Sequence, residues 1–493
     1  MTIRRAASAG LWSTIDFGLR LGLQFVVTVV MARLLMPADF GVVALLAFFS
    51  SLAMVFVQGG LTTALIQRQD TTPDEESAVF WWNLAASLFF ALLLILLAAP
   101  VAAFYGYPVL RPLMFMAAAQ VVLSAFGAVQ TALLTRALRF ADLAKAGVLA
   151  TLVASVGGVG AALAGAGVWA LAIQMVTMAA VNTTILWWVS DWRPVFHFRL
   201  ATIRRLLSFG AWFGLSNALE VLYTQGFALF VGKLYGLRDL GLYNRAAGTQ
   251  FLPGSIISNT ISRIALPLFS ERATDPDALR RGLKLALGFA MVFNLPVMTG
   301  MALLSDLIIL VLFGEKWLPA APILSILALG GLVLPMHILN LQLLLAEGRS
   351  ATYFRMEIVK KVIGIAGLTL GSFFGIMGLA FSQLAISIVA LFVNIEPIRR
   401  SLGYGAARQF GDVRGIVLAT AVMAGVVLLL RPLLHVSPAV DLGILMLAGA
   451  ASYAGFGLAF RIRGFTDAWS VAKLLVRPVP AQAPAGIESA PFP

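Results

Sequence analysis

The 493-residue chain contains no cysteine, only three histidines, and few charged residues, which make up 12% of it. Soluble globular domains carry about 25% charged residues, so the chain lies outside that class. The lack of cysteine excludes disulfides and thiolate metal sites, but it says nothing about the compartment. The sequence also lacks a metal-spaced histidine cluster, a phosphate-binding glycine loop and the paired acidic motif of sugar transferases. We therefore expect neither a cofactor nor an enzymatic activity.

Apolar residues dominate the composition instead. Hydrophobic residues make up 60% of the chain, and the mean hydropathy is +0.94. A membrane-spanning helix needs about 20 predominantly apolar residues, and no ten-residue alternation typical of a membrane β-barrel is present. The sequence predicts an all-α integral membrane protein with about fourteen transmembrane helices. The predicted spans are 10–34, 40–66, 77–104, 111–135, 145–164, 167–190, 206–234, 241–269, 284–312, 319–346, 353–373, 376–396, 415–432 and 440–460.

The positive charge is distributed unevenly between the loops. A net charge of +13 is compatible with nucleic acid binding, but its placement favours a membrane topology. With a cytoplasmic amino terminus, 24 Lys and Arg residues fall on the inner side and four in the outer loops. This asymmetry follows the positive-inside rule, which places both termini in the cytoplasm and excludes nucleic acid as a partner.

The sequence is internally repeated. Residues 10–47 recur without a gap two hundred positions later, so that RLLMPADFG at 33–41 matches KLYGLRDLG at 233–241. Similarity continues more weakly, and Phe104-Tyr105-Gly106 corresponds to Leu312-Phe313-Gly314. Because six spans separate the copies, both enter the membrane in the same direction. We expect two six-helix lobes in a parallel pseudo-two-fold repeat, the arrangement of a transporter with a central substrate path.

The repeat sets the expected domain boundaries, and the last two spans have no counterpart in it. The predicted domains are an N-terminal lobe at 1–190, a cytoplasmic linker at 191–205, a C-terminal lobe at 206–400, an appended helix pair at 401–477 and a disordered tail at 478–493.

Polar side chains form a stripe on the first predicted helix and on its repeat. Ser13, Asp16, Arg20, Gln24 and Thr28 recur every three or four residues, so they share one helix face. The equivalent helix carries polar residues at Ser216, Asn217, Glu220 and Thr224. Polar groups on matching faces of both copies indicate that the faces meet across a shared, wetted space.

The eighth predicted span is polar as well. Arg245 and Arg263 are eighteen residues apart, or five helical turns, and share a face with Asn259. Basic residues outnumber acidic ones within the spans: the basic ones include Arg20, Arg33, Lys233, Arg245, Arg263, Lys360 and Lys361, and the acidic ones include Asp16, Glu220, Asp306 and Glu357. A charge at the centre of a spanning helix costs roughly 2.5–3.5 kcal/mol, so such residues are kept in pairs, in water or for function. The cationic excess favours an anionic substrate.

Some of these residues also have purely structural interpretations. Asp16 and Arg20 form an i, i+4 pair and can neutralise each other. Asp39 and Asp239 each begin a helix, where N-capping is the favoured explanation. Both interpretations stay open beside a functional role.

The basic residues Arg33 and Lys233 close their helices on the outer side, where they can complement the helix dipole. Glu220 and Arg263 lie well inside spans with no opposite charge within one turn. For them, a contact with the substrate or the coupling ion is favoured over a structural role.

Five segments resemble the polysaccharide transporters of the multidrug/oligosaccharidyl-lipid/polysaccharide exporter superfamily, of the colanic-acid-exporter type. The segments are ARLLMPADFG at 32–41, LIQR at 65–68, FGAW at 209–212, GLYNRA at 241–246 and VLFGEKW at 311–317. The resemblance implies that undecaprenyl-diphosphate-linked oligosaccharide is moved from the cytoplasmic to the periplasmic leaflet of the bacterial inner membrane. It further implies alternating access of the lobes, a polymerase and a co-polymerase as partners, and a lipid-tail groove along the last two helices.

Together these observations define the predicted site. The substrate-facing candidates are Arg20, Gln24, Asn217, Arg245, Asn259 and Arg263. Asp16 and Glu220 are the candidates for coupling to a proton or sodium, and a gate or turn motif comprises Arg33, Asp39, Lys233 and Asp239.

Two other functions compete with this prediction. A drug or small-molecule exporter of the same fold should show an excess of buried acids, whereas this chain shows an excess of bases. A membrane polysaccharide polymerase or ligase usually works through a long basic outer loop, and every predicted outer loop is short.

Overall fold

The computed structural model describes residues 18, 21–58, 60–68, 71–196, 200–270, 275–462, 464 and 465. Within these ranges, the side chains of 200–213, 259, 260, 263, 264, 267 and 268 are not described. Every regular element of the described part is a helix, which confirms the predicted all-α class.

The helices are Leu21–Leu34, α2 (Pro37–Gln58), α3 (Leu61–Gln67), α4 (Pro73–Tyr105), α5 (Leu110–Phe126), α6 (Ala128–Arg136), α7 (Phe140–Leu163), α8 (Val168–Val189), α9 (Leu200–Leu234), α10 (Leu237–Ser270), α11 (Pro276–Leu303), α12 (Ser305–Phe313), the 3-10 helix η1 (Glu315–Ala320), α13 (Ala321–Gly331), α14 (Leu334–Ala346), α15 (Ser350–Ser372), α16 (Gly375–Leu402), α17 (Ala406–Leu430), the 3-10 helix η2 (Arg431–Leu433) and α18 (Pro438–Ala459).

Ten helical stretches in the described part are long and apolar enough to cross a membrane. The four other predicted spans coincide with Leu21–Leu34, α9, α10 and α15. The described part of the first is short, and the other three carry charged residues that lower their hydropathy. The count of fourteen therefore stays a prediction.

The chain divides into two compact units. Unit 1 comprises Met1–Gly248, Ile308–Ile323 and Phe374–Met377, and unit 2 comprises Thr249–Leu307, Leu324–Phe373 and Gly378–Pro493. The division falls inside α10, whereas the predicted lobes divide at 191–205. The two units are defined by packing, whereas the predicted domains are defined by the sequence repeat. The five predicted domains therefore stay predictions.

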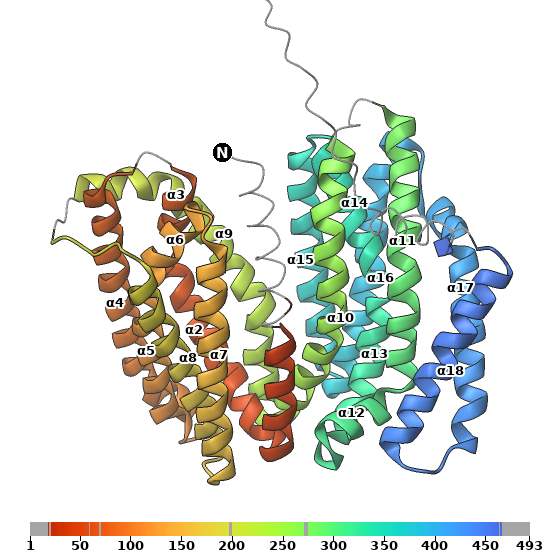
Figure 1. Cartoon of the computed structure of the whole chain (residues 1–493), viewed down its shortest axis with the longest axis horizontal. Coiled ribbons are helices and arrows are strands. Elements are labelled where there is room, and N and C mark those ends of the chain that lie inside the picture. Colours follow the sequence, from red (N-terminus) through yellow and green to blue (C-terminus); the bar gives the residue numbers. More distant parts are fainter. Residues whose placement is uncertain are drawn as a thin grey trace, which may run out of the picture. The chain divides into compact units, whose positions relative to one another are not determined.

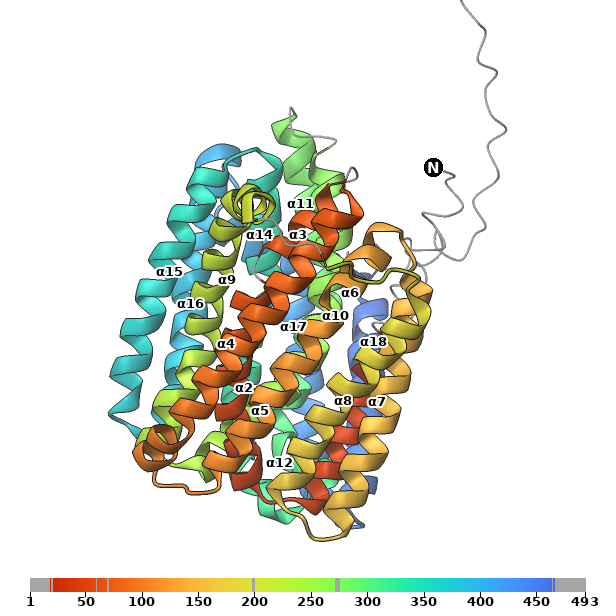
Figure 2. The same cartoon turned by 90° about the vertical axis from the view of Figure 1, so that its left-hand side faces the viewer.

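Unit 1 is a bundle in which α9, the first helix of the predicted second lobe, packs on the first lobe. Helix α7 lies against α8, α8 against α5, and α5 against α4 and α2, while α2 also lies against α9 (Figures 1 and 2). Small residues allow close packing here, because the space beside Gly232 of α9 is filled by Leu45 of α2. The helix Leu21–Leu34 contributes Val27 and Met31 to a buried cluster with α8.

A buried ion pair holds together the end of unit 1 that is predicted to be cytoplasmic. The guanidinium of Arg136 lies 2.6 Å from a carboxylate oxygen of Glu76, and the two side chains are only 20% and 7% exposed. Arg136 also donates to the hydroxyl of Thr71 and to the carbonyl of Arg68. One arginine thus joins α6 to α4 and to the end of α3.

We expect Glu76→Gln to destabilise the protein by about 1–3 kcal/mol, because it leaves the buried guanidinium without its counter-charge. Thermal unfolding in detergent measures the change. Asp142→Asn is the matched control, because it removes an exposed pair with Arg139 that should contribute about 0–1 kcal/mol. Equal shifts for the two variants would contradict this account of Glu76.

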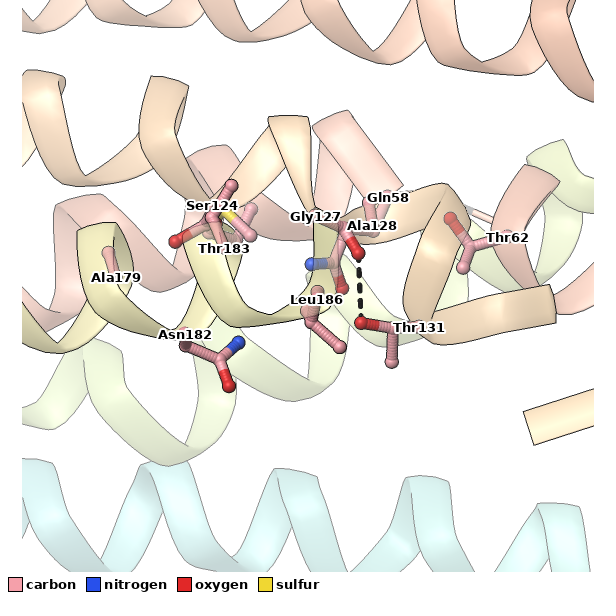
Figure 3. Close-up of a pocket in the computed structure, with 11 residues that line it drawn as sticks. Gln58, Thr62, Ser124, Gly127, Ala128, Thr131, Ala179, Asn182, Thr183 and Leu186 are labelled. Carbon is pink, nitrogen blue, oxygen red and sulfur yellow. Dashed lines mark hydrogen bonds between the residues drawn. The ribbon is translucent and has the colours of Figure 1, made fainter. Parts of the chain in front are cut away.

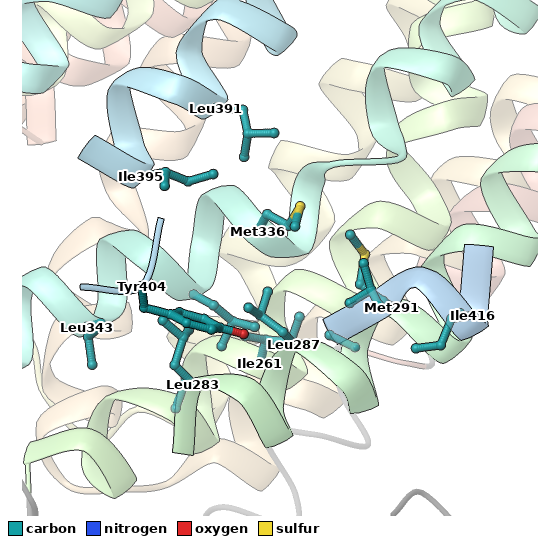
Figure 4. Packing of buried hydrophobic residues seen from close by; sticks show 14 of the residues in the cluster. Ile261, Leu283, Leu287, Met291, Met336, Leu343, Leu391, Ile395, Tyr404 and Ile416 are labelled. Carbon is teal, nitrogen blue, oxygen red and sulfur yellow. The ribbon is translucent and has the colours of Figure 1, made fainter. Parts of the chain in front are cut away.

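A large apolar core lies in the described part of unit 2, and Figure 4 shows part of it. Leu287 and Met291 of α11 pack with Met336 of α14, Ile395 of α16 and Ile416 of α17. Burial of such side chains stabilises each by about 1.5–3 kcal/mol. The core therefore unites helices that are far apart in the sequence.

The last helix pair is part of this core. The hydroxyl of Tyr453 in α18 donates to the carbonyl of Val292 in α11 at 2.7 Å, and α17 lies along α11. Between α16 and α17, the Tyr404 hydroxyl donates to Asp412 at 2.8 Å. Burial and this carboxylate raise the pKa of Tyr404 above its ordinary value. The pair that the repeat leaves unmatched is thus packed into unit 2.

Candidate functional site

The first turns of α2 and α10 touch through two glycines. A methyl group at Gly41 of α2 would lie 1.8 Å from the carbonyl oxygen of Leu237 in α10. A methyl group at Gly241 of α10 would lie 1.8 Å from the carbonyl oxygen of Pro37 in α2. Only glycine fits at either position, and both contacts lie within unit 1.

The two basic residues of the predicted gate each cap a helix of the other half. Nε of Arg33 donates to the carbonyl of Leu312 at 2.9 Å, and its Nη2 donates to the carbonyl of Val311. Both carbonyls belong to the last turn of α12, whose final oxygens have no partner along the helix. A second hydrogen bond runs in the opposite direction, because Nζ of Lys316 donates to the carbonyl of Arg33 at 2.8 Å.

Lys233 makes the corresponding contact with the end of α4. Its Nζ donates to the carbonyl of Phe104 and lies 4.3 Å from the centre of the Phe104 ring. Helix α4 ends at Gly106 with a left-handed backbone (φ 76°), which is the usual glycine helix stop. The hydroxyl of Tyr105 also donates to the carbonyl of Leu229 in α9, at 3.2 Å.

These contacts obey the sequence repeat. Arg33 and Lys233 are two hundred positions apart, and their acceptors Leu312 and Phe104 are the residues that the weaker part of the repeat aligns. The glycine contacts are related in the same way, because Gly41 faces Leu237 and the equivalent Gly241 faces Pro37. A pseudo-two-fold axis therefore passes between α2 and α10. We call this site the outer junction, and it comprises Arg33, Pro37, Gly41, Phe104, Lys233, Leu237, Gly241 and Leu312.

The outer junction combines a rigid contact with a weak one. The side chains of Arg33 and Lys233 are exposed, and a cation at an exposed helix C-terminus contributes about 0.3–1 kcal/mol. Water can replace such a contact at little cost. The glycine contacts are different, because backbone atoms cannot be rearranged.

Arg245 lies beside the outer junction in a pocket of aromatic rings. Its guanidinium carbon is 4.4 Å from the ring centre of Phe40, 5.2 Å from that of Phe313 and 5.4 Å from that of Trp317. Trp317 is fully buried and donates from Nε1 to the carbonyl of Ala32 at 2.8 Å. Cation–π contacts that exclude water are worth about 2 kcal/mol. Arg245 thus joins α10 to α2 and α12.

The structure brings the four predicted gate residues to one place. Asp39 is in the first turn of α2, and its carboxylate accepts from the backbone nitrogen of Met36 at 2.9 Å, as a residue that begins a helix does. Asp239 has the same position in α10. Helix α2 begins at Pro37, so Asp39 is the third residue of its first turn and bonds back to Met36, and it does not occupy the predicted N-cap position. Arg33 and Lys233 donate to the carboxyl ends of α12 and α4.

The structure does not bring the remaining predicted site residues together within the part of the chain that it describes. Asp16 and Arg20 lie outside the described residues, as do the side chains of Asn259 and Arg263. The other predicted residues are placed as follows: Gln24 and Glu220 are exposed, Asn217 is half-buried, and the Arg245 guanidinium faces three rings. Their substrate and coupling roles stay predictions.

Three features of the site were not predicted from the sequence. They are the steric role of Gly41 and Gly241, the acceptors at Phe104 and Leu312, and the buried Trp317. The repeat carried the signal for the first two, because residues related by a two-fold axis tend to touch each other's equivalents. No signal in the sequence pointed to the ring pocket around Arg245.

Two solved structures have a similar fold. The chain superposes on "Lipid II flippase MurJ, inward closed conformation" with a TM-score of 0.74 at 15% identity, over 92% of this chain and 99% of that one. It also matches an inward-facing multidrug resistance MATE family transporter of the MOP superfamily, with a TM-score of 0.59 at 15% identity, over 82% and 99% of the chains. The chain has the fold of these two transporters, and with its long apolar helices it is a multi-pass membrane protein.

Sequence similarity narrows this class to a family. Residues 30–322, more than half of the chain, match the family described as polysaccharide biosynthesis protein. The succinoglycan biosynthesis transport protein ExoT of Rhizobium meliloti (strain 1021) is 29% identical over 74% of each chain. The lipopolysaccharide biosynthesis protein WzxC of Escherichia coli (strain K12) is 25% identical over 81% of this chain and 82% of its own length. The chain belongs to the polysaccharide biosynthesis protein family, which confirms the predicted resemblance.

Proposed function

We propose that the protein is a flippase that moves a polyprenyl-diphosphate-linked oligosaccharide from the cytoplasmic to the periplasmic leaflet of the bacterial inner membrane. Its termini lie in the cytoplasm, and it works by alternating access of the two repeat halves. The transported units supply the synthesis of a surface polysaccharide, and a polymerase and a co-polymerase act on them next.

The observation that carries this proposal is the outer junction in a chain of this family. Transport across a membrane needs a path whose ends open in turn. The junction supplies a closure for the periplasmic end, made by matching residues of both halves and held by exposed hydrogen bonds. Opening it exposes helix-end carbonyls to water, which can satisfy them.

The charges within the predicted spans support an anionic headgroup. A diphosphate cannot enter hydrocarbon without a large loss of hydration, and a cationic, watered path lowers this barrier. In this proposal Arg20 and Arg263 bind the diphosphate, and Gln24, Asn217 and Asn259 are further contacts with the headgroup. Asp16 or Glu220 binds the proton or sodium that drives transport.

Deletion of the gene tests the proposal. Lipid-linked oligosaccharide should accumulate in the cytoplasmic leaflet. Surface polysaccharide should fall at least about tenfold, because the charged headgroup would have to cross the hydrocarbon without a polar path. Lipid extraction with mass spectrometry measures the first effect and identifies the glycan. A plasmid copy of the wild-type gene should reverse both effects.

Two results would contradict the proposal. Normal surface polysaccharide without accumulated lipid-linked sugar would exclude a flippase role in this pathway. Unchanged polysaccharide with increased drug sensitivity would favour the rival exporter of the same fold.

A further inference from the structure

A polar cavity that is partly open to its surroundings lies inside unit 1, away from the outer junction. Its volume is about 230 Å³, and it is lined from α2, α3, α5, α6 and α8 (Figure 3). The polar residues that line it are Gln58, Thr62, Ser124, Thr131, Asn182 and Thr183. Since α2, α5 and α8 run inward in the predicted topology, these residues belong to the cytoplasmic half of the bundle.

Two interrupted helices meet at this cavity. The break between α2 and α3 includes Gly60, which has a left-handed backbone (φ 70°). The break between α5 and α6 falls at Gly127, where a methyl group would lie 3.1 Å from the hydroxyl of Thr183. Interrupted helices inside a membrane protein are tolerated where the backbone lines a watered space, and transporters build their binding sites from them.

The hydroxyls on the cavity wall can act mainly as acceptors. Thr131 donates its proton to the carbonyl of Gly127 at 2.9 Å, and Thr183 donates to the carbonyl of Leu123 at 2.8 Å. A hydroxyl has one proton and two lone pairs, so both residues can now only accept from a ligand. The hydroxyl of Thr62 is buried and has no hydrogen-bond partner among the described residues.

The lining contains no charged residue, which argues against binding of the diphosphate itself. A metal cation would fit acceptor oxygens, but the cavity is far larger than an ion requires. Its volume falls below the 300–1,000 Å³ typical of pockets for drug-sized ligands. Size and chemistry therefore favour one small, uncharged group that carries several hydroxyl donors.

We propose that this cavity binds a single uncharged sugar residue of the transported glycan on the cytoplasmic side, through the oxygens of Thr62, Thr131 and Thr183 and the amide of Asn182. This proposal rests on the proposed flippase function and names the part of its substrate that the cavity recognises. The site selects for the sugar, whereas the cationic residues select for the diphosphate.

The chain has no cysteine, so a single introduced thiol reports on the cavity. Ser124→Cys in the full-length protein is treated in native membranes with a small methanethiosulfonate reagent. Membranes that contain the lipid-linked glycan should slow the reaction by about fivefold or more, the effect of at least one hydrogen bond to the ligand. Membranes from cells blocked in glycan assembly, which contain only the polyprenyl phosphates, should give the fast rate. Thr62→Cys provides a second thiol in the cavity if Ser124→Cys does not fold.

Asp191→Cys controls for access of the reagent, because Asp191 is fully exposed in the segment that follows α8. Its rate should be the same in both membranes. Three results would overturn the proposal: no reaction at either cavity thiol, equal rates in the two membranes, or protection by sodium over potassium without any glycan. The last result would identify the cavity as a cation site.

Export separates this inference from the proposed function. Thr131→Val with Asn182→Leu should lower surface polysaccharide by about two- to tenfold for each group removed. Thr184→Val is the matched control, because Thr184 is exposed on the same helix and does not line the cavity. The double variant is compared with the deletion strain. Wild-type export by the double variant, together with accumulation of lipid-linked sugar in the deletion strain, would contradict the sugar site but not the flippase function.

Discussion

Replacing Gly241 by alanine is expected to reduce polysaccharide export at least about tenfold. The added methyl group would lie 1.8 Å from the carbonyl oxygen of Pro37, so α10 and α2 must move apart. Overpacking of this kind typically costs 1–3 kcal/mol and more against rigid backbone. In the proposed alternating-access cycle, the closed outer junction would become a minor state, and the periplasmic end would no longer close.

Gly41→Ala should have the same effect, because its methyl group meets Leu237 in the mirrored contact. Gly248→Ala on the same helix is the control, since nothing lies within 4 Å of its position. Surface polysaccharide is measured in the deletion strain, with the amount of each variant in the membrane determined in parallel. Full export by either junction variant at normal abundance would show that the closed contact is not used.

The second large effect is expected from Arg33→Gln combined with Lys233→Gln. Each substitution removes a cation from the carboxyl end of the opposite helix, at a cost of about 1 kcal/mol for an exposed contact. Because the two contacts have different acceptors, their costs should add to about 2 kcal/mol, a shift of roughly thirtyfold toward the open state. Each single variant should shift the equilibrium about fivefold toward the open state.

Opening can be followed with one thiol, since the chain contains no other. Leu240 is fully buried at the start of α10, and Leu240→Cys should react with a thiol reagent only when the junction opens. The reaction should accelerate in the double variant. Arg238→Gln removes an exposed positive charge from the same turn of α10 and should leave the rate unchanged. An equal effect of Arg238→Gln would mean that net charge matters and the two hydrogen-bonded contacts do not.

The ring pocket of Arg245 shows what residue spacing leaves open. Five helical turns separate Arg245 from Arg263, and that spacing predicted a shared wet face. The guanidinium of Arg245 lies among Phe40, Phe313 and Trp317. Helical periodicity says which residues share a face, but it does not say whether water, lipid or aromatic rings lie opposite that face.

The last helix pair gives a second example. The repeat identified α17 and α18 as unmatched, and this relation can be read from the sequence. Their packing on α11 through Tyr453 and Ile416 depends on shape and burial, for which no short sequence pattern exists.

The sequence alone determined the class, because the length and apolarity of helices that cross a membrane are dictated by hydrocarbon and are local properties of the chain. It also determined the doubling, since two copies of one segment remain visible as letters two hundred positions apart. Only the tertiary structure decided which copy touches which: that Arg33 caps α12, that Lys233 caps α4, and that each glycine admits the backbone of the other half. Such contacts depend on the path of the backbone in space, and residues distant in the chain meet there for reasons that no local pattern contains.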